Sequence, residues 1–349
     1  MVVARCAVGA PFAAEVIAMQ ANVHDVVVIG GGAAGLSAAL VLGRARRRVA
    51  VVDAGAPRNA PAAHMHGFLS RDGMPPADLL AAGRAEVAGY GVELVADQVE
   101  RVEPGFVVRL AGGRVLPARR ILLTTGVRDE LPDIPGVRER WGRDLLHCPY
   151  CHGWEVRDQP LGTLGTGPGA VAHAQLVRQW SDDVVFFAHT HPLTAPERVQ
   201  LRARGIQIVH GEVTRLVVEA DRLTGVQLAD GRMVARTAVF LRPGNTPHPD
   251  GLLTELGCQT DEAGFVTVDS TGRTSTAGVW AAGNVVDPRG QVIAAAGAGN
   301  TAGIALNADL VAEDVDRAVG AHHAAGDVFT AATEARLTTA VLGDRRHGL

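Results

Sequence analysis

The sequence predicts an α/β protein built from two doubly wound units, with the second unit inserted into the first. Three observations predict this arrangement. A buried strand at residues 24–29 runs into a glycine-rich loop and an alanine-rich helix, and a similar strand, loop and helix begin again at residue 161. A strand and glycine turn at residues 278–284 come late in the chain. Because they follow a complete second unit, we expect the C-terminal segment to complete the first.

The same breaks predict the domain boundaries. A chain of 349 residues is long enough for about two ordinary domains. We expect an N-terminal extension at residues 1–21, a discontinuous first domain at 22–131 and 244–318, an inserted second domain at 132–243, and a C-terminal tail at 319–349.

The composition excludes several classes of protein. Apolar residues make up 47% of the chain and charged residues 20%, so the chain can bury a core and is not a disordered polymer. A net charge of -4 argues against a general binder of nucleic acids or of anionic membranes. All 33 basic residues are arginine, which excludes a Walker-type phosphate loop, a pyridoxal Schiff base and any lysine nucleophile.

The chain shows no segment expected to enter a membrane. No apolar run reaches the roughly 18 residues that span a bilayer. Residues 1–21 carry an alanine-rich stretch broken by Glu15, without a clean cleavage site. We interpret them as an extension, with a signal peptide as the less favoured alternative. Four cysteines in a chain of this length cannot form the disulfide framework of a small secreted protein, so we expect a cytoplasmic protein.

The first glycine loop carries the fingerprint of a dinucleotide-binding, Rossmann-like unit. Gly30 permits a tight turn, Gly32 lets the backbone approach a pyrophosphate, and Gly35 lets the helix pack closely on the strand. The N-terminus of that helix offers free N–H groups to the phosphates. Asp53 ends the next strand, where a carboxylate accepts hydrogen bonds from a ribose diol.

The second glycine loop follows the GxGxxA variant of the same fingerprint, with Gly165, Gly167 and Ala170 at the three positions. A strand at 183–188 follows its helix. The residues after that strand are His189-Thr-His191, where no acid awaits a ribose 2′-hydroxyl and no arginine awaits a 2′-phosphate. Nearby arginines at 198, 202 and 204 are equally typical of a solvated helix face. Whether this unit binds NAD(P)H therefore stays open.

The remaining elements are predicted more coarsely. The final long helix is expected to end near residue 318, and a short helix at 331–341 is interpreted as a surface helix without an assigned function. Further β-segments are expected at 92–99, 106–110, 120–125, 226–228, 237–241 and 265–269.

Cys148 and Cys151 form a CxxC pair in the stretch His147–Glu155, and this pair is the predicted centre of the chemistry. Two cysteines on the first turn of a helix can close a disulfide, and the helix N-terminus stabilises the thiolate of Cys148. The alternative is half of a zinc site. Zinc needs four ligands, and the other two cysteines lack partners at usable spacing, so the sequence favours a redox dithiol and predicts no metal.

With these motifs in place, residues 24 to about 315 resemble a low-molecular-weight thioredoxin reductase-like flavoprotein. The resemblance rests on the first glycine loop, the Thr124-Thr125-Gly126 turn, the CxxC pair and the late Gly283-Asn284 turn followed by Gln291. It implies FAD in the first domain, with the disulfide of the inserted domain facing the flavin ring. It also implies that Cys151 is the sulfur nearer the flavin, that Cys148 reacts with the external dithiol or disulfide, and that the protein is a homodimer.

The resemblance also implies which residues hold FAD. The adenylate half would be held by the first glycine loop and Asp53, and the ribityl and flavin end by residues around the late glycine turn. The residues implied are Gly30, Gly32, Ala33, Ala34, Gly35, Asp53, Arg58, Asn59, His64, Val99, Thr125, Gly126, Gly283, Asn284, Gln291 and Val292.

Three departures from the reductase pattern point to another activity. His152 stands where an Asp is usual, Asn284 replaces the Asp of the late glycine turn, and the usual His-Arg-Arg after the second domain's second strand is absent. The stretch at 148–155, Cys-Pro-Tyr-Cys-His-Gly-Trp-Glu, is similar to that of the dithiol oxidases of the holomycin and gliotoxin type. Those enzymes close a disulfide within a small molecule and have no need of tight NADPH binding.

The expected function is therefore oxidation of a small-molecule dithiol by FAD and the cysteine pair, with O₂ as acceptor and His152 as the base that takes the thiol proton. A histidine that only caps its helix is the alternative for His152, and Met65 and Trp154 are interpreted as packing residues. Two other functions stay open: an NAD(P)H-dependent reductase of thioredoxin, and a non-catalytic flavoprotein that senses redox state. No nucleic acid or membrane is expected as a partner.

Overall fold

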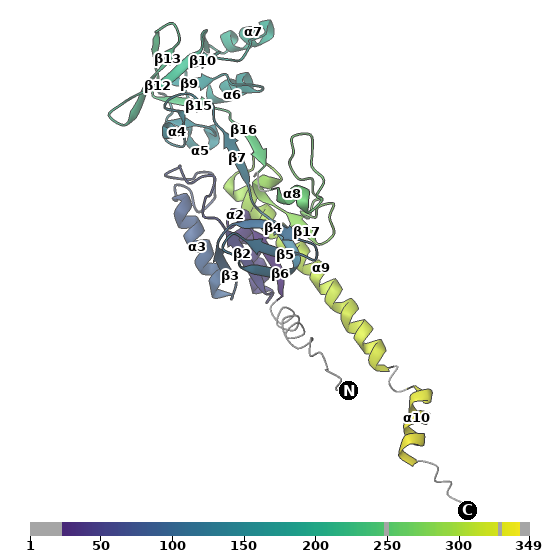
Figure 1. Ribbon diagram of the computed structural model, residues 1–349. Helices are drawn as coiled ribbons and strands as arrows, with labels where there is room; N and C mark the ends of the chain where they lie inside the picture. Colours follow the sequence, from purple (N-terminus) through teal and green to yellow (C-terminus); the bar gives the residue numbers. More distant parts are fainter. Residues whose placement is uncertain (1–22, 248–250, 327–329, 343–349) are drawn as a thin grey trace, which may run out of the picture.

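Figure 1 shows the computed structural model, which describes residues 23–247, 251–326 and 330–342. The expected N-terminal extension at 1–21 lies outside the described residues. The chain forms two sheets of parallel strands joined by a narrow two-stranded ribbon, and a long C-terminal helix extends away from the first sheet. This is the α/β architecture of two Rossmann-like units that the sequence predicts.

The first unit is organised around a parallel sheet in the order β3-β2-β1-β6-β17. β1 and β2 are rich in valine and, like β17, almost wholly buried, as expected for strands covered on both faces, whereas β3 at the edge is partly exposed. β17 comes from the C-terminal segment and pairs with β6 of the first unit. The second unit is therefore inserted into the first, as the sequence predicts. The strand bounds are β1 (His24–Ile29), β2 (Val49–Asp53), β3 (Glu93–Ala96), β6 (Val115–Leu123) and β17 (Val279–Ala281).

One face of this sheet is covered by α2 (Ala33–Arg44), α3 (Pro76–Gly89) and α9 (Val292–Gly326), and the other carries an antiparallel meander of β4 (Val99–Glu103), β5 (Val107–Leu110) and the start of β6. Helix α9 lies directly on α2. A Cβ on Gly299 would stand 2.0 Å from the backbone oxygen of Ala34, so only glycine permits this approach. α8 (Leu252–Glu255) lies against β4, packing Leu252 into the second face.

The second unit contains a five-stranded parallel sheet in the order β11-β10-β9-β15-β8. One face of this sheet packs on α6 and α7, and a separate antiparallel sheet of β12, β13 and β14 packs against the opposite face. The strand bounds are β8 (Leu145–Leu146), β9 (Leu161–Leu164), β10 (Val184–Phe187), β11 (Gln207–Val209), β12 (Val213–Glu219), β13 (Arg222–Leu228), β14 (Met233–Ala235) and β15 (Ala238–Leu241); the helices are α4 (Val137–Arg140), α5 (Pro149–His152), α6 (Ala170–Val177) and α7 (Ala195–Ala203).

The chain passes between the two units through β7 (Val127–Glu130) and β16 (Gly244–Pro247), which pair with each other as an antiparallel ribbon. Asp129 of β7 anchors this ribbon to the first unit. Its carboxylate accepts two hydrogen bonds from Arg58, at 2.6 and 2.9 Å, and a third from the Nδ2 of Asn245 on β16, at 2.7 Å.

Most predicted elements are present, with three differences. Residues 265–269 form no strand and contribute only an isolated bridge between Thr260 and Val266. The final helix does not end near 318 but runs to Gly326, because residues 319–326 contain several alanines, the strongest helix formers, and no proline. Several elements were not predicted, namely β7, β8, β11, β12, β14, β16, α3, α4 and α8. The short helix expected at 331–341 is α10 (Ala331–Leu342). Within the described part of the chain, every helix is too short or too polar to cross a bilayer.

Candidate active site

The CxxC pair lies at the start of α5 and is closed as a disulfide between Cys148 and Cys151. Cys148 is the N-cap, with extended backbone angles, and Pro149 takes the first helical position, where its missing N–H costs nothing. The N–H of Cys151 donates to the Sγ of Cys148 at 3.2 Å. This contact stabilises a thiolate on Cys148 when the disulfide is reduced, as the sequence predicts for a redox dithiol.

Gln291 brings the disulfide of the second unit against the first unit. It is the residue before α9, and its Nε2 lies 3.8 Å from the Sγ of Cys148 and 3.7 Å from the Sγ of Cys151. The sequence analysis assigned Gln291 to the cofactor. The structure places it beside both sulfurs, across the boundary between the units.

Three histidines surround the pair, and burial lowers the pKa of each. His147 is bonded through Nδ1 to the backbone oxygen of Leu241, at 3.2 Å, and His173 donates from Nε2 to the backbone oxygen of His147, at 2.9 Å. The pKa of His173 falls to about 4. The imidazole of His152 makes no hydrogen bond to any described residue, so at neutral pH the uncharged ring keeps a free lone pair.

A loop of the first unit approaches this segment through His66, which the sequence analysis did not select. Nε2 of His66 lies 3.4 Å from Glu155, and Nδ1 lies 3.3 Å from Asp72. His64, the residue that the resemblance implied, is exposed and bonds within its own loop to the oxygen of Gly73. The one feature of the sequence that could have pointed to His66 is the His-Met-His pattern at 64–66. Met65 is buried, and the two histidines on either side of it have different surroundings.

Of the two side chains interpreted as packing residues, Met65 is buried, at 5% exposure, and Trp154 is not. Trp154 is 65% exposed and carries the guanidinium of Arg157 over its ring at 3.9 Å. The interpretation of Trp154 was wrong because the turn after α5 leaves it outside the core, where a cation–π contact replaces burial.

The first glycine loop has the shape of a phosphate cradle. A Cβ on Gly30 would lie 2.3 Å from the oxygen of Thr124, and one on Gly35 would lie 1.9 Å from the oxygen of Gly30, so both must be glycine. Nothing lies within 4 Å of a Cβ on Gly32, and no side chain caps α2 there. An open space at an uncapped helix N-terminus fits a pyrophosphate. Asp53 ends β2 with its side chain 32% exposed.

The late glycine turn lies beside this cradle. Gly283 has a φ of +82°, and a Cβ there would lie 2.8 Å from the Cβ of Ala34. Asn284 donates from Nδ2 to the backbone oxygens of Asp287 and Gly290, both at 2.8 Å. An aspartate could not donate these bonds, which explains why an amide stands at this position. Val292 begins α9.

The other residues implied for the cofactor are dispersed. Arg58 is engaged by Asp129 and by the oxygen of Pro288, at 2.7 Å, and Asn59 lies in the same turn. Thr125 and Gly126 connect β6 to β7. Val99 is 5% exposed, with its side chain in the hydrophobic core. Ala33 begins α2.

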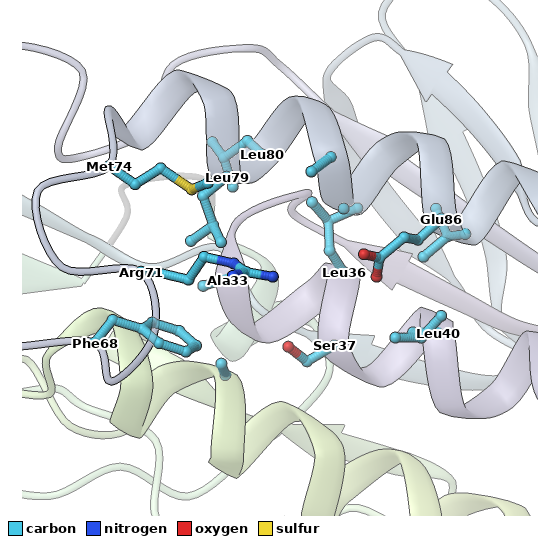
Figure 2. Close-up of a pocket in the computed structure, with 14 residues that line it drawn as sticks. Ala33, Leu36, Ser37, Leu40, Phe68, Arg71, Met74, Leu79, Leu80 and Glu86 are labelled. Atoms are coloured by element: carbon cyan, nitrogen blue, oxygen red, sulfur yellow. The ribbon is translucent and has the colours of Figure 1, made fainter. Parts of the chain in front are cut away.

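Figure 2 shows an apolar pocket between α2, α3 and α9, which Phe68, Arg71 and Met74 border from the loop that carries His66. Ala33 lines it, and no predicted catalytic residue does. Among the described residues, no group of three or more His, Cys, Asp or Glu side chains is arranged to hold a metal ion.

The second glycine loop is arranged differently from the first. A Cβ on Gly169 would stand 2.0 Å from the guanidinium of Arg242, so this side chain lies over Gly169, whereas nothing lies within 4 Å of a Cβ on Gly167. His189 accepts a hydrogen bond at Nδ1 from the N–H of Val213, at 3.0 Å, and His191 lies 3.1 Å from Glu197. Both histidines after β10 are therefore engaged within the protein.

Known proteins with similar sequences and structures were compared with this chain. The family model of the pyridine nucleotide-disulphide oxidoreductases matches residues 24–300. Thioredoxin reductase sirT of Leptosphaeria maculans is 32% identical, over 84% of this chain and 96% of the relative. Thioredoxin reductase tcpT of Claviceps purpurea is 31% identical, again over 84% of this chain and 96% of the relative.

Two solved structures are similar over most of the chain. The crystal structure of HlmI is 60% identical with a TM-score of 0.85, covering 87% of this chain and 97% of that one. The structure of an oxidoreductase from Agrobacterium tumefaciens is 36% identical with a TM-score of 0.78, covering 83% of this chain and 99% of that one. With its disulfide closed against the first unit, this chain belongs to the pyridine nucleotide-disulphide oxidoreductase family and is a thioredoxin reductase-like disulfide oxidoreductase.

Proposed function

We propose that this protein is an FAD-dependent oxidase that converts a small-molecule dithiol to an intramolecular disulfide through Cys148 and Cys151, with O₂ as the electron acceptor. The observation that carries the proposal is a disulfide joined through Gln291 to the unit whose glycine loop suits FAD, combined with a second glycine loop in which Arg242 lies over Gly169. Similarity of the stretch at 148–155 to the dithiol oxidases of the holomycin and gliotoxin type supports the choice of substrate.

The residues present fit a flavin dinucleotide. The open space at Gly32 and the uncapped α2 would receive the pyrophosphate, and Asp53 the ribose. The late turn at Gly283 and Asn284 would support the flavin end, beside Gln291. When bound, the flavin accepts the electron pair of the reduced cysteines and delivers it to O₂.

The first chemical step is thiol–disulfide exchange at Cys148. His152 takes the proton of a substrate thiol, a role that its lowered pKa and free lone pair permit at neutral and mildly acidic pH. The substrate thiolate attacks the Sγ of Cys148, a substrate–Cys148 disulfide forms, and the bond between Cys148 and Cys151 breaks with Cys151 as the leaving thiolate.

The second step closes the product. The other substrate thiol attacks the substrate sulfur of the mixed disulfide, and Cys148 leaves as a thiolate. The N–H of Cys151, 3.2 Å from this sulfur, stabilises the leaving group. One disulfide has broken in the enzyme and one has formed in the substrate, so two electrons and two protons have passed to the protein.

The experiment that tests this function follows O₂ consumption by the purified protein with a panel of reduced natural-product dithiols. We expect one peroxide and one substrate disulfide per O₂ consumed, and loss of turnover in Cys148→Ser. Cys258→Ser serves as the matched control, because Cys258 is the free, buried cysteine elsewhere in the described structure. Full turnover by Cys148→Ser would refute the mechanism.

The second candidate function is an NAD(P)H-dependent reductase of a protein disulfide. The relatives named thioredoxin reductase favour it. Under this function electrons flow the other way, and NADPH should bleach the flavin rapidly under anaerobic conditions. The engaged His189 and His191 argue for slow or absent bleaching.

We further propose that the protein partner is a second copy of this chain, docked on α9. One side of α9 packs on α2 through Ala302, Leu306 and Leu310. The opposite side exposes a second apolar stripe in the 4-3-4 spacing of a helix–helix seam, formed by Ile304, Ala308, Val311 and Val315. A helix that is apolar on both sides is normally buried on both, so Val311→Asp should convert a dimer to a monomer in sedimentation experiments.

A further inference from the structure

We infer that Gln291 sets the reduction potential of the Cys148–Cys151 pair: its carboxamide stabilises the reduced cysteines and so makes the disulfide a stronger oxidant. The inference deepens the proposed function and rests on it for the direction of electron flow. It assigns to Gln291 a role toward the sulfurs, as a positioning residue, beyond the cofactor contact that the resemblance implied.

The contacts of Gln291 show which end of its carboxamide faces the disulfide. Nε2 of Gln291 faces both sulfurs, at 3.8 and 3.7 Å. Its Oε1 points the other way, 3.6 Å from the place that a Cβ on Gly67 would take. The donor end of the amide therefore faces the sulfur pair and the acceptor end faces the space that a glycine leaves open. With the N–H of Cys151, two donors point at Cys148.

These donors act more strongly on one redox state than on the other. A disulfide sulfur is a neutral, weak acceptor, whereas a thiolate accepts a charge-assisted hydrogen bond of roughly twice the strength. Donors aimed at the sulfurs thus lower the free energy of the reduced pair more than that of the disulfide. A disulfide whose reduced form is stabilised is the stronger oxidant. The contacts of Gln291 favour electron transfer from a substrate dithiol to the enzyme.

The backbone at Gln291 is held in place by the late glycine turn and the start of α9. Asn284 donates to the oxygen of Gly290, the residue before Gln291, and Arg58 donates to the oxygen of Pro288 in the same turn. The oxygen of Gln291 accepts the first helical hydrogen bond of α9 from Ala295, at 2.9 Å. Gln291 belongs to the first unit and the disulfide to the second. The Cys148–Cys151 pair therefore has its most positive reduction potential only while the two units are in contact.

The test measures the potential of the cysteine pair in the full-length protein as purified, without turnover. Wild type, Gln291→Leu and Gln291→Glu are equilibrated in dithiothreitol redox buffers, quenched in acid, alkylated, and counted for free thiols by mass spectrometry. We expect Gln291→Leu to reduce the equilibrium constant for disulfide reduction about tenfold, a shift of about 30 mV to more negative potential. Gln291→Glu should shift it further, because a carboxylate repels the thiolate.

The matched control is Gln200→Leu, which removes an exposed carboxamide from α7 and should leave the potential unchanged. A second readout is the pH dependence of alkylation of the reduced pair, whose midpoint should move to higher pH in both Gln291 variants. The inference would be overturned if the equilibrium constant for disulfide reduction in Gln291→Leu were within twofold of wild type. A shift of the potential to more positive values would overturn it too. Failure of wild type to consume O₂ with any dithiol would refute the proposed function and leave this measurement intact.

Discussion

The two glycine loops of this protein have similar sequences and different neighbours. Nothing lies within 4 Å of a Cβ on Gly32 or on the equivalent Gly167, and neither following helix has a side-chain cap. Only in the second loop does an arginine side chain, Arg242, lie over a glycine, Gly169, and both histidines after β10 have partners inside the protein. The comparison teaches that a glycine pattern predicts a strand–loop–helix unit reliably, whereas the side chains that reach the loop from elsewhere decide whether a nucleotide can enter.

The second unit uses its glycine-loop helix for another purpose. His173 on α6 donates to the backbone oxygen of His147, the residue before the redox pair. The helix that would follow a nucleotide phosphate therefore holds the start of the CxxC segment. In the proposed enzyme, the first copy of the fold holds FAD and the second supports the disulfide.

The largest effect is expected from substituting equivalent glycines in the two loops, which tests whether only the first loop binds the flavin. Gly32→Ala and Gly167→Ala both place a methyl group where the described structure has no atom within 4 Å, and neither glycine has a positive φ. Both variants should fold. Gly32→Ala should lose flavin, with affinity lowered about a thousandfold, ~4 kcal/mol, because the methyl group takes the place of the pyrophosphate.

Gly167→Ala should keep the flavin absorbance of wild type, because its loop holds no cofactor in the proposed enzyme. Flavin content per folded protein, with circular dichroism as the check on folding, measures both variants. Equal flavin loss in the two would refute the assignment of the cofactor to the first loop.

The support role of α6 predicts a pH dependence of stability. Burial lowers the pKa of His173 to about 4 from a usual value near 6.5, so between these pH values the unfolded chain binds one more proton at this site than the folded chain. Stability is therefore highest above pH 6.5 and falls as the pH is lowered, by about 3 kcal/mol for this group.

Chemical denaturation at pH 7 and pH 4 measures this difference. His173→Gln keeps a donor for His147 and removes the titration, so its unfolding free energy should depend less on pH than that of wild type. His210→Gln, an exposed histidine, should behave as wild type. A His173→Gln protein with an unchanged pH dependence would show that His173 is solvated.

The fold was largely predictable from the sequence, because local patterns fix local elements. Apolar runs next to the two glycine loops predicted β1, β2, β9 and β10 to within a residue or two, and a strand after the second unit predicted that β17 joins the first sheet. The end of α9 was predicted eight residues too early, because the polar residues after 318 suggested a tail, whereas the alanines among them favour continuing the helix.

The site was predictable where neighbours in sequence make it, as in the closed Cys148–Cys151 pair. It was not predictable where distant segments meet. The approach of Gln291 to the sulfurs and of His66 to Glu155 depends on how the two units dock, and no spacing in the sequence reports it.

A smaller effect is expected at the late glycine turn, which only the first unit has. Asn284→Asp removes the donor of two hydrogen bonds to backbone oxygens, both 2.8 Å long, and should reduce the unfolding free energy by about 1–3 kcal/mol and weaken flavin retention. The matched control is Asn307→Asp. Asn307 accepts a hydrogen bond from Arg47 at 2.8 Å, and an aspartate can still accept it. Thermal unfolding should separate the two variants, and equal melting temperatures would contradict this account of Asn284.

The smallest effect is expected from substituting Arg242, whose side chain lies over Gly169 of the second loop. If no nucleotide enters there, Arg242→Ala changes only a surface side chain, and dithiol oxidation should stay within about twofold of wild type. Anaerobic bleaching of the flavin by NADPH should remain slow in both proteins, because removing Arg242 supplies no cation for a 2′-phosphate and leaves Glu197 in place. Rapid bleaching in wild type that Arg242→Ala abolishes would mean that Arg242 binds the nucleotide phosphates, and the second loop would then be a cofactor site like the first.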